Sequence, residues 1–238
     1  MLEDIGFRVG AGEVVVLLGP SGAGKTTLFR CLTRLVEADA GEIRLLGRSI
    51  GGLAPQALRR ARREVGLVFQ QHNLIRRRSA LDNVLAGRLA EVPLWRVAAR
   101  RFGAAERQRA YAALDRVGLL EFAGRRADRL SGGQQQRVAI ARVLAQQGRV
   151  ILADEPVASL DPVSAIAVLS LLRELARQDG IAVLCSLHQV DLVPGFADRV
   201  LGLSAGRLVA DEPIAEFRLA RANGSATPNP TRGRSAIS

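Results

Sequence analysis

The chain has 238 residues, a hydrophobic fraction of 48% and a formal net charge of +11. This length suffices for one large α/β domain with an inserted subdomain, and no apolar run approaches the ~20 residues of a membrane-spanning helix. Acidic Glu3 and Asp4 stand where a signal peptide would be basic, so we expect a cytoplasmic protein. Cys31 and Cys185 lie in apolar surroundings without metal-ligand spacing, which predicts reduced core residues.

The excess of arginine raises the question of a nucleic-acid partner. Aromatic residues make up 4% of the chain and do not interleave with the basic runs, as stacking platforms for bases would. The arginines gather instead on expected helix faces, such as Arg59–Arg63. The pattern therefore favours a solvated basic surface, or one near anionic lipid headgroups, over nucleic-acid binding.

The first strong pattern is a strand, a glycine-rich loop and a helix. The apolar run Val14–Leu18 predicts a buried parallel strand, and residues 26–35 predict a helix. The loop between them fits the phosphate-binding pattern G-x-x-x-x-G-K-[ST]. Together with the residue that follows, it consists of Gly19, Pro20, Ser21, Gly22, Ala23, Gly24, Lys25, Thr26 and Thr27. The alternative is an ordinary glycine-rich turn.

The residue types of this loop suit phosphate chemistry. Glycines have no Cβ, so backbone N–H groups can approach phosphate oxygens, and the helix N-terminus adds partial positive charge. Lys25 can reach the β- and γ-phosphates, while the Thr26 hydroxyl can ligate Mg²⁺. Lys25 is the only lysine among the 34 basic residues, and a planar guanidinium would not replace its compact ammonium.

After residue 40 the sequence first alternates between apolar and polar residues and then takes a helical pattern. The expected elements are an edge hairpin at 41–50, a helix at 55–63, a strand at Val65–Phe69, and helices at 81–89 and 104–117. Gln70 follows the strand directly. Residues 72–128 are rich in arginine and alanine and contain no strand candidates, so they predict an inserted helical subdomain.

After residue 128 the α/β alternation returns. The expected elements are a helix at 135–147, a strand at Val150–Ala153, a helix at 163–178, a strand at 181–185, a helix at 190–196, and closing strands at 200–203 and 206–210. We therefore predict one α/β domain at 1–222, with a core at 1–71 and 129–222. The composition of 223–238 predicts a disordered tail.

Two further motifs carry candidate chemistry. Asp154 and Glu155 end an apolar strand, where the first could hold Mg²⁺ and the second could act as a general base. Ser131 is a good N-cap before Gly132 and Gly133, and the free N–H groups of that helix turn could bind an anion. Taken singly, Asp154-Glu155 also fits a solvated strand end, and the Ser131 motif also fits a plain capped helix.

The ordered set of motifs resembles the ATP-binding subunits of ABC transporters. The resemblance covers residues 1 to about 212 and rests on the phosphate loop, Gln70, the Leu130–Gln134 signature, Asp154-Glu155, Ser159-Leu160-Asp161 and His188. It implies a RecA-like P-loop NTPase core with a small antiparallel β-subdomain and an inserted helical subdomain. It also implies that the cofactors are ATP and Mg²⁺.

The resemblance implies a role for each matching residue. Glu155, His188 and Gln70 would be catalytic, with Gln70 near Mg²⁺ or the attacking water, and Thr26, Gln70 and Asp154 would hold the metal. The opposite subunit's nucleotide would be contacted by Ser131, Gly132, Gly133 and Gln134, with Asp161 at the dimer seam. Judged singly, Gln70 is a polar strand end and His188 a surface imidazole.

Within that family the chain looks most like the ATPase subunits of phosphonate importers. The residues that carry this likeness are Asn83–Leu89, Asp154–Pro162 and Leu187–Leu192. The likeness implies uptake of phosphonates or a related phosphorus oxyanion. The expected partners are a second copy in a homodimer, integral-membrane permease subunits and a substrate-binding protein, with no nucleic acid. The expected place is the cytoplasmic face of the inner membrane.

Two departures from the family and three alternatives accompany this prediction. Residues beyond about 222 match nothing in the family. The family's adenine-stacking aromatic lies upstream of the equivalent of Leu2, and Phe7 is not expected to replace it, so either the start lies upstream of Met1 or the ATPase is shortened. The alternatives are an ATPase of another importer, a soluble ABC ATPase acting on nucleic acid or ribosomes, and an inactive structural subunit.

Overall fold

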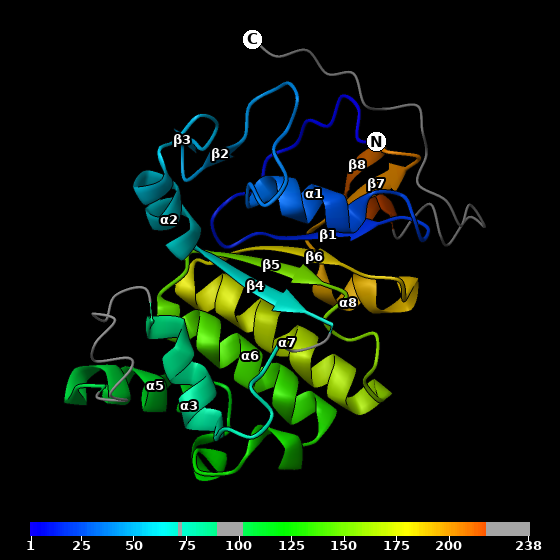
Figure 1. The fold of residues 1–238 in the computed structure, drawn as a ribbon. Helices are drawn as coiled ribbons and strands as arrows, with labels where there is room; N and C mark the ends of the chain where they lie inside the picture. Colours follow the sequence, from blue (N-terminus) through cyan, green and yellow to red (C-terminus); the bar gives the residue numbers. More distant parts are fainter. Residues whose placement is uncertain (71–72, 90–101, 218–238) are drawn as a thin grey trace.

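The molecule is built around one mixed six-stranded sheet with the strand order β4-β5-β6-β1-β7-β8. The computed structural model describes residues 1–70, 73–89 and 102–217 (Figure 1). The strands are β1 (Val14–Leu18), β4 (Val65–Phe69), β5 (Val150–Asp154), β6 (Ala182–Ser186), β7 (Arg199–Ser204) and β8 (Arg207–Pro213). The pairs from β4 to β7 are parallel, and β8 joins β7 in antiparallel fashion.

Helices cover both faces of this sheet (Figure 1). They are α1 (Lys25–Leu32), α2 (Pro55–Arg63), α3 (Ala80–Leu85), α5 (Ala104–Arg116), α6 (Gly132–Gln146), α7 (Pro162–Asp179) and α8 (Val193–Phe196). Short 3₁₀ turns are η1 (Ala86–Arg88), η2 (Leu120–Phe122), η3 (Ala127–Arg129) and η4 (Val190–Leu192). No helix in the described ranges is both long and apolar enough to cross a membrane.

The buried strand β1 shows why two layers of helices are needed. Its side chains alternate between two apolar clusters. Val14 and Val16 belong to the cluster that includes residues of α6 and α7, whereas Val15 and Leu17 belong to the cluster with Leu28 of α1. A parallel strand buried on both faces reads as a continuous apolar run, which is why the sequence identified it. The predicted α/β fold class is confirmed.

The parallel topology gathers the candidate residues at one edge of the sheet. The register pairs Phe69 of β4 with Asp154 of β5, and Asp154 with Ser186 of β6. Leu17 of β1 also pairs with Ser186. Because ligands of open α/β sheets bind outside the carboxyl ends of the strands, this edge is the expected site.

Most predicted elements agree with the structure, and their boundaries differ by a few residues. Helix α6 begins at Gly132 rather than at 135, because Ser131 and Gln134 form a capping box before it. The strand expected at 181–185 is β6, which extends to Ser186. Cys185 is a buried core residue as predicted, whereas Cys31 is only half-buried. The predicted tail at 223–238 lies outside the described residues.

Three residues of the stretch resembling phosphonate-importer ATPases prove to be packing residues around α3. The Asn83 side chain accepts the N–H of Ile75 at 2.7 Å and donates to Ile75 O and Ser79 O, so it holds the segment that leads into α3. A Cβ on Gly87 would lie 2.3 Å from Arg142 O of α6. Buried Arg88 donates to Ala145 O in the last turn of α6 at 3.0 Å. The division into a core and a helical subdomain stays a prediction.

The N-terminal residues lie along the sheet without forming a strand themselves. Leu2, Ile5, Phe7 and Val9 are half-buried and pack on the apolar cluster beside α1. The expected hairpin at 41–50 consists of β2 (Arg44–Leu45) and β3 (Arg48–Ser49). Within the described residues the second sheet therefore has two strands.

Candidate functional site

The phosphate loop leaves the carboxyl end of β1 at the middle of the sheet and leads directly into α1. Gly24 precedes the helix with φ +107°, a backbone conformation that side-chain-bearing residues rarely adopt. A Cβ on Gly19 would lie 2.3 Å from Leu203 O of β7, so the loop can enter beside the sheet only with glycine there. The backbone is thereby shaped as a loop at a helix N-terminus, which favours anions.

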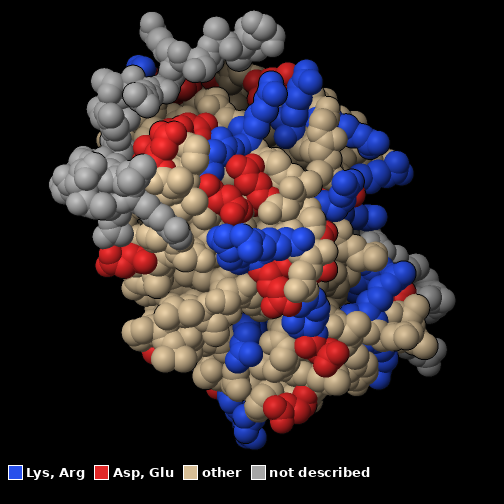
Figure 2. Space-filling view, turned by 180° about the vertical axis from the view of Figure 1, so that it is seen from behind, with Lys and Arg blue, Asp and Glu red and all other residues tan. Residues whose placement is uncertain are grey.

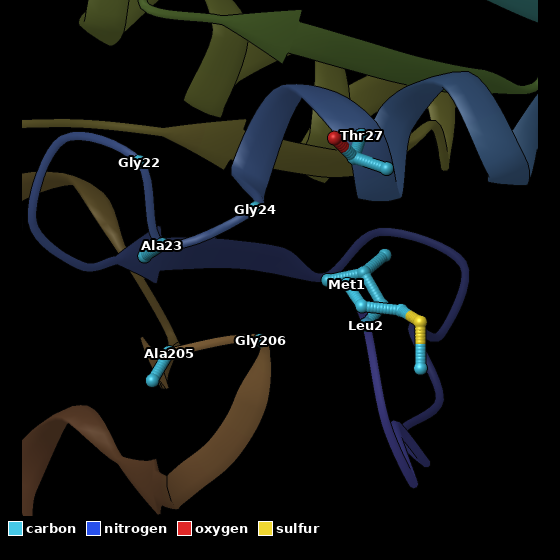
Figure 3. Close-up of a pocket in the computed structure, with 8 residues that line it drawn as sticks. All are labelled: Met1, Leu2, Gly22, Ala23, Gly24, Thr27, Ala205 and Gly206. Carbon is cyan, nitrogen blue, oxygen red and sulfur yellow. The ribbon is translucent and has the colours of Figure 1, made fainter.

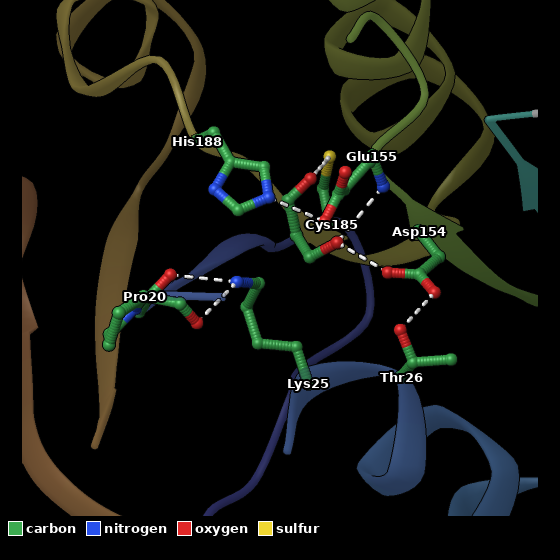
Figure 4. Close-up of polar contacts among 9 residues, drawn as sticks. Pro20, Lys25, Thr26, Asp154, Glu155, Cys185 and His188 are labelled. Atoms are coloured by element: carbon green, nitrogen blue, oxygen red, sulfur yellow. Dashed lines mark hydrogen bonds and ion pairs between the residues drawn. The ribbon is translucent and has the colours of Figure 1, made fainter. Parts of the chain in front are cut away.

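The Lys25 ammonium lies inside this loop (Figure 4). The side chain is 5% exposed, and its Nζ donates to Gly19 O at 2.7 Å and to Pro20 O at 3.2 Å. Among the described residues no carboxylate forms an ion pair with Lys25. A buried cation is costly without a counter-charge, so this ammonium fits an anionic ligand such as a phosphate.

Thr26 and Asp154 meet although they are far apart in sequence. The Thr26 hydroxyl donates to Asp154 Oδ2 at 2.9 Å, and the Asp154 side chain is largely buried at the end of β5. A hydroxyl and a carboxylate are the hard oxygen ligands that Mg²⁺ prefers. The structure thus brings together two of the three residues predicted to hold the metal.

Glu155 and His188 form the second contact of the site (Figure 4). His188 Nε2 lies 2.6 Å from Glu155 Oε1, and the two side chains are 40% and 24% exposed. The pair lies at the ends of neighbouring strands, with access to solvent and next to the Asp154 carboxylate. Its geometry suits a carboxylate that accepts a proton from water and an imidazole that orients it.

Sequence reasoning missed one residue that the structure places in this group. Ser186 is fully buried at the end of β6, and its hydroxyl donates to Asp154 Oδ1 at 2.7 Å. The oxygen of the Ser186 hydroxyl also accepts the N–H of Glu155 at 2.9 Å. The available signal was a hydroxyl that ends an otherwise apolar strand two residues before His188.

Beside the phosphate loop lies a cavity of about 270 Å³ (Figure 3). It is lined by Met1, Leu2, Gly22, Ala23, Gly24, Thr27, Ala205 and Gly206. Among these described lining residues none is aromatic, and Phe7 packs instead in the apolar cluster beside α1. The cavity adjoins the loop on the side of the β7–β8 turn.

The predicted signature lies at the start of α6. Ser131 caps the helix by accepting the Gln134 N–H, and Gln134 Oε1 accepts the Ser131 N–H at 3.0 Å. A Cβ on Gly133 would lie 2.9 Å from the Ser164 side chain of α7, so this glycine allows two helix starts to touch. Among the described residues no hydrogen bond or ion pair joins the signature to the phosphate loop.

Gln70 and Asp161 are exposed at two different ends of the site. Gln70 stands in a turn one residue beyond β4, beside the end of β5, and in the described part of the chain no hydrogen bond joins its side chain to Asp154. Asp161 caps α7, where its carboxylate accepts the Ser164 N–H at 2.9 Å. The hydrogen bonds from Ser164 lower the pKa of the Asp161 carboxyl.

Beneath the site, the buried thiol of Cys185 has a shifted pKa. Burial raises the pKa of the Cys185 thiol well above its usual value, and the neighbouring Asp154 carboxylate adds to the shift. The thiol therefore stays neutral and unreactive beneath the carboxylate. Cys185 is a core residue, and its one polar contact in this group is the weak bond that its thiol donates to the Ser186 carbonyl at 3.7 Å (Figure 4).

The fold and the loop define a phosphate-loop nucleotide-binding protein, and sequence comparisons specify its family. A sequence model of the ABC transporter family matches residues 2–158. The hypophosphite import ATP-binding protein HtxD of Stutzerimonas stutzeri is 54% identical over 91% of this chain and 64% of its own length. The phosphonates import ATP-binding protein PhnC of Wolinella succinogenes is 48% identical over 91% of this chain and 78% of its own.

Solved structures agree with this assignment. The dimeric ATP-binding cassette MJ0796, in a post-hydrolysis state bound to ADP and Pi, is 33% identical, with a TM-score of 0.75 over 90% of both chains. The cassette cbiO1 of Clostridium perfringens, part of the cbiONQ transporter complex, gives a TM-score of 0.81 at 29% identity and covers 92% of this chain. The chain therefore belongs to the ABC transporter family, and its predicted membership is confirmed.

Proposed function

We propose that this chain is the ATP-hydrolysing subunit of an importer for phosphonates or a related phosphorus oxyanion such as hypophosphite. The observation that carries the proposal is the cluster at the strand ends, where Thr26, Asp154, Glu155 and His188 meet beside the buried Lys25 ammonium. The names of the HtxD and PhnC relatives supply the cargo class. The chain spans 64% of the length of HtxD. The cargo class in this proposal therefore rests on similarity to these relatives.

In this proposal each residue has a defined task. The loop N–H groups and Lys25 hold the β- and γ-phosphates, and the Thr26 hydroxyl with the Asp154 carboxylate would hold Mg²⁺. The metal, when bound, would neutralise charge on the phosphate oxygens. Glu155 accepts a proton from the attacking water, while His188 orients its carboxylate and reaches toward the γ-phosphate. Catalysis is then positioning and charge stabilisation.

The active unit in this proposal is a homodimer arranged head to tail. No hydrogen bond or ion pair joins the phosphate loop to the Ser131–Gln134 signature in the described part of the chain, and in this proposal a second copy brings its signature to the nucleotide. Beside Asp161, the side chains of Val163 and Ile166 are apolar and yet 79% and 56% exposed. Exposed apolar groups at this end of α7 suit a surface that a protein partner covers.

The other partners follow from the importer assignment. The dimer would dock on permease subunits at the cytoplasmic face of the inner membrane, and a substrate-binding protein would deliver the cargo. Action on nucleic acid is the weaker alternative. On the face shown in Figure 2 acidic side chains interrupt the arginines, and a nucleic-acid surface would more often present a basic stripe.

Replacement of Glu155, the proposed general base, tests the catalytic part of this proposal. Glu155→Gln should keep ATP binding and lower ATP turnover by about 10²–10⁴-fold, because a positioned general base is worth that much. Glu174→Gln is the matched control, since Glu174 of α7 pairs with Arg116 of α5 outside the site. Turnover by the purified protein and nucleotide binding are both measured. Near wild-type turnover in Glu155→Gln would overturn the assignment of the base.

Growth tests the cargo. Deletion of the gene in its host should abolish growth on a phosphonate or hypophosphite as sole phosphorus source, while growth on phosphate continues. Complementation with the wild-type gene should restore growth, and complementation with the Glu155→Gln gene should not. Unchanged growth of a deletion strain without a second copy of the system would remove the cargo assignment and leave the ATPase assignment intact.

A further inference from the structure

Ser186 occupies an unusual place for a polar side chain. It ends β6, is fully buried, and lies directly beside Asp154 of β5 in the parallel register. The rest of β6 is apolar, with a burial pattern that leaves no residue exposed to solvent. A buried hydroxyl is retained at low cost only where it is hydrogen-bonded, so its partners indicate what it does.

Both hydrogen-bonding functions of the Ser186 hydroxyl are directed at the catalytic group. Its proton goes to Asp154 Oδ1 at 2.7 Å, and its oxygen accepts the Glu155 N–H at 2.9 Å. The Thr26 hydroxyl engages the other oxygen, Asp154 Oδ2, at 2.9 Å. The carboxylate is therefore held at both oxygens and cannot rotate freely.

Glu155 needs such support because its backbone is strained. Its φ is +50°, in the left-handed region that residues other than glycine seldom occupy. The Glu155 N–H has one defined acceptor, the Ser186 hydroxyl, while the Glu155 carboxylate meets His188 two residues further along the same segment. The end of β6 thus holds both the backbone and the side chain of Glu155.

We propose that Ser186 is a positioning residue for ATP hydrolysis, which locks the Asp154 carboxylate and the Glu155 backbone into one arrangement. The inference rests on the proposed roles of Asp154 and Glu155. One hydroxyl couples the carboxylate that would hold the metal to the backbone of the residue whose carboxylate accepts the proton. Loss of the hydroxyl frees both at once, without removing any group that touches the nucleotide.

Three substitutions test this proposal. Ser186→Ala removes the hydroxyl and should lower kcat by about 10–100-fold, the usual effect of removing an outer partner of a metal ligand. The Mg²⁺ concentration for half-maximal activity should rise by a similar factor, while ATP binding without Mg²⁺ stays within about twofold. Ser186→Thr and Ser186→Val have the same shape and differ only in the hydroxyl. The threonine variant should exceed the valine variant in kcat by about tenfold or more.

The Thr and Val pair keeps the test decisive if the alanine variant fails to fold. Val183→Ala is the matched control, because it removes a buried group from the same strand three residues before Ser186 and should leave kcat and the Mg²⁺ dependence unchanged. Equal kcat and equal Mg²⁺ dependence of the threonine and valine variants would overturn the proposal. Inactivity of Glu155→Gln together with full activity of all Ser186 variants would refute Ser186 alone, whereas an active Glu155→Gln would refute the proposed base.

Discussion

Gly66 lies at a close approach of the sheet and helix α6, and it offers a sharp test of the packing. It lies in β4 opposite Ile151 of β5, and β4 packs on α6 (Figure 1). A Cβ at this position would lie 1.9 Å from Val143 Cγ1 and 2.6 Å from Val143 Cγ2. The same strand leads to Gln70 and the same helix begins with the signature, so this contact sets the two relative to each other.

The cost of Gly66→Ala follows from that overlap. An ordinary contact needs at least 3.4 Å, so the strand or the helix must move by about 1.5 Å. Overpacking of a core costs about 1–3 kcal/mol, and the stiff β-branched side chain of Val143 favours the upper end. Relief of the backbone entropy of glycine returns about 0.5–1 kcal/mol. We expect a net destabilisation of about 2 kcal/mol.

A second substitution should rescue the first. Val143→Ala alone removes two buried methyl groups and should cost about 2–3 kcal/mol, including the cavity. In the double variant the methyl group of the alanine at 66 occupies the vacated space. The double variant should therefore be more stable than the sum of the two single effects predicts, by about 1–3 kcal/mol.

Guanidinium unfolding of the wild type, both single variants and the double variant measures this coupling. Gly195→Ala is the control, because a Cβ there meets no atom within 4 Å, and it should be neutral or slightly stabilising. Single effects that add within about 0.5 kcal/mol would refute the reasoning, as would a Gly66→Ala variant as stable as the control.

Three further predictions concern single side chains. Arg88→Met should cost about 1–3 kcal/mol in guanidinium unfolding, since a buried carbonyl of α6 loses its donor, and unchanged stability would contradict this. Hydrogen bonds from Ser164 lower the pKa of the Asp161 carboxyl in the folded protein below its value in the unfolded chain. The stability that these hydrogen bonds contribute is therefore fully present above the unfolded pKa and is lost as the pH falls through the folded pKa. The stability gap to Asp161→Asn should accordingly shrink in acid, and a gap independent of pH would disprove the link. A thiol reagent should modify half-buried Cys31 first and reach Cys185 only on unfolding, and rapid labelling of both in the native protein would contradict the burial.

The elements that the sequence predicted well are those whose signal is local. Val14–Leu18 and Val65–Phe69 agree with the observed strands to the residue, because buried parallel strands are short uninterrupted apolar runs. The start of α6 was placed three residues late, at 135 rather than 132. Gly132 and Gly133 are poor helix formers taken alone. A Cβ on Gly132 would lie 3.0 Å from Leu160 and one on Gly133 2.9 Å from Ser164 of α7, so the structure explains why small residues begin this helix.

The sequence by itself determined the loop, its single lysine and the order of the motifs along the chain. Those features depend on neighbouring residues, so composition and spacing suffice to identify them. Only the tertiary structure decided which of them meet. Thr26 reaches Asp154 across 128 residues and Ser186 reaches it across 32, because strand order and register put the ends of β1, β5 and β6 side by side. Parallel strands are joined by long crossovers, so the pairing of their ends depends on packing between segments that are far apart in the chain. For that reason only the structure shows that a buried serine at the end of an apolar strand joins the Asp154 carboxylate to the backbone N–H of Glu155.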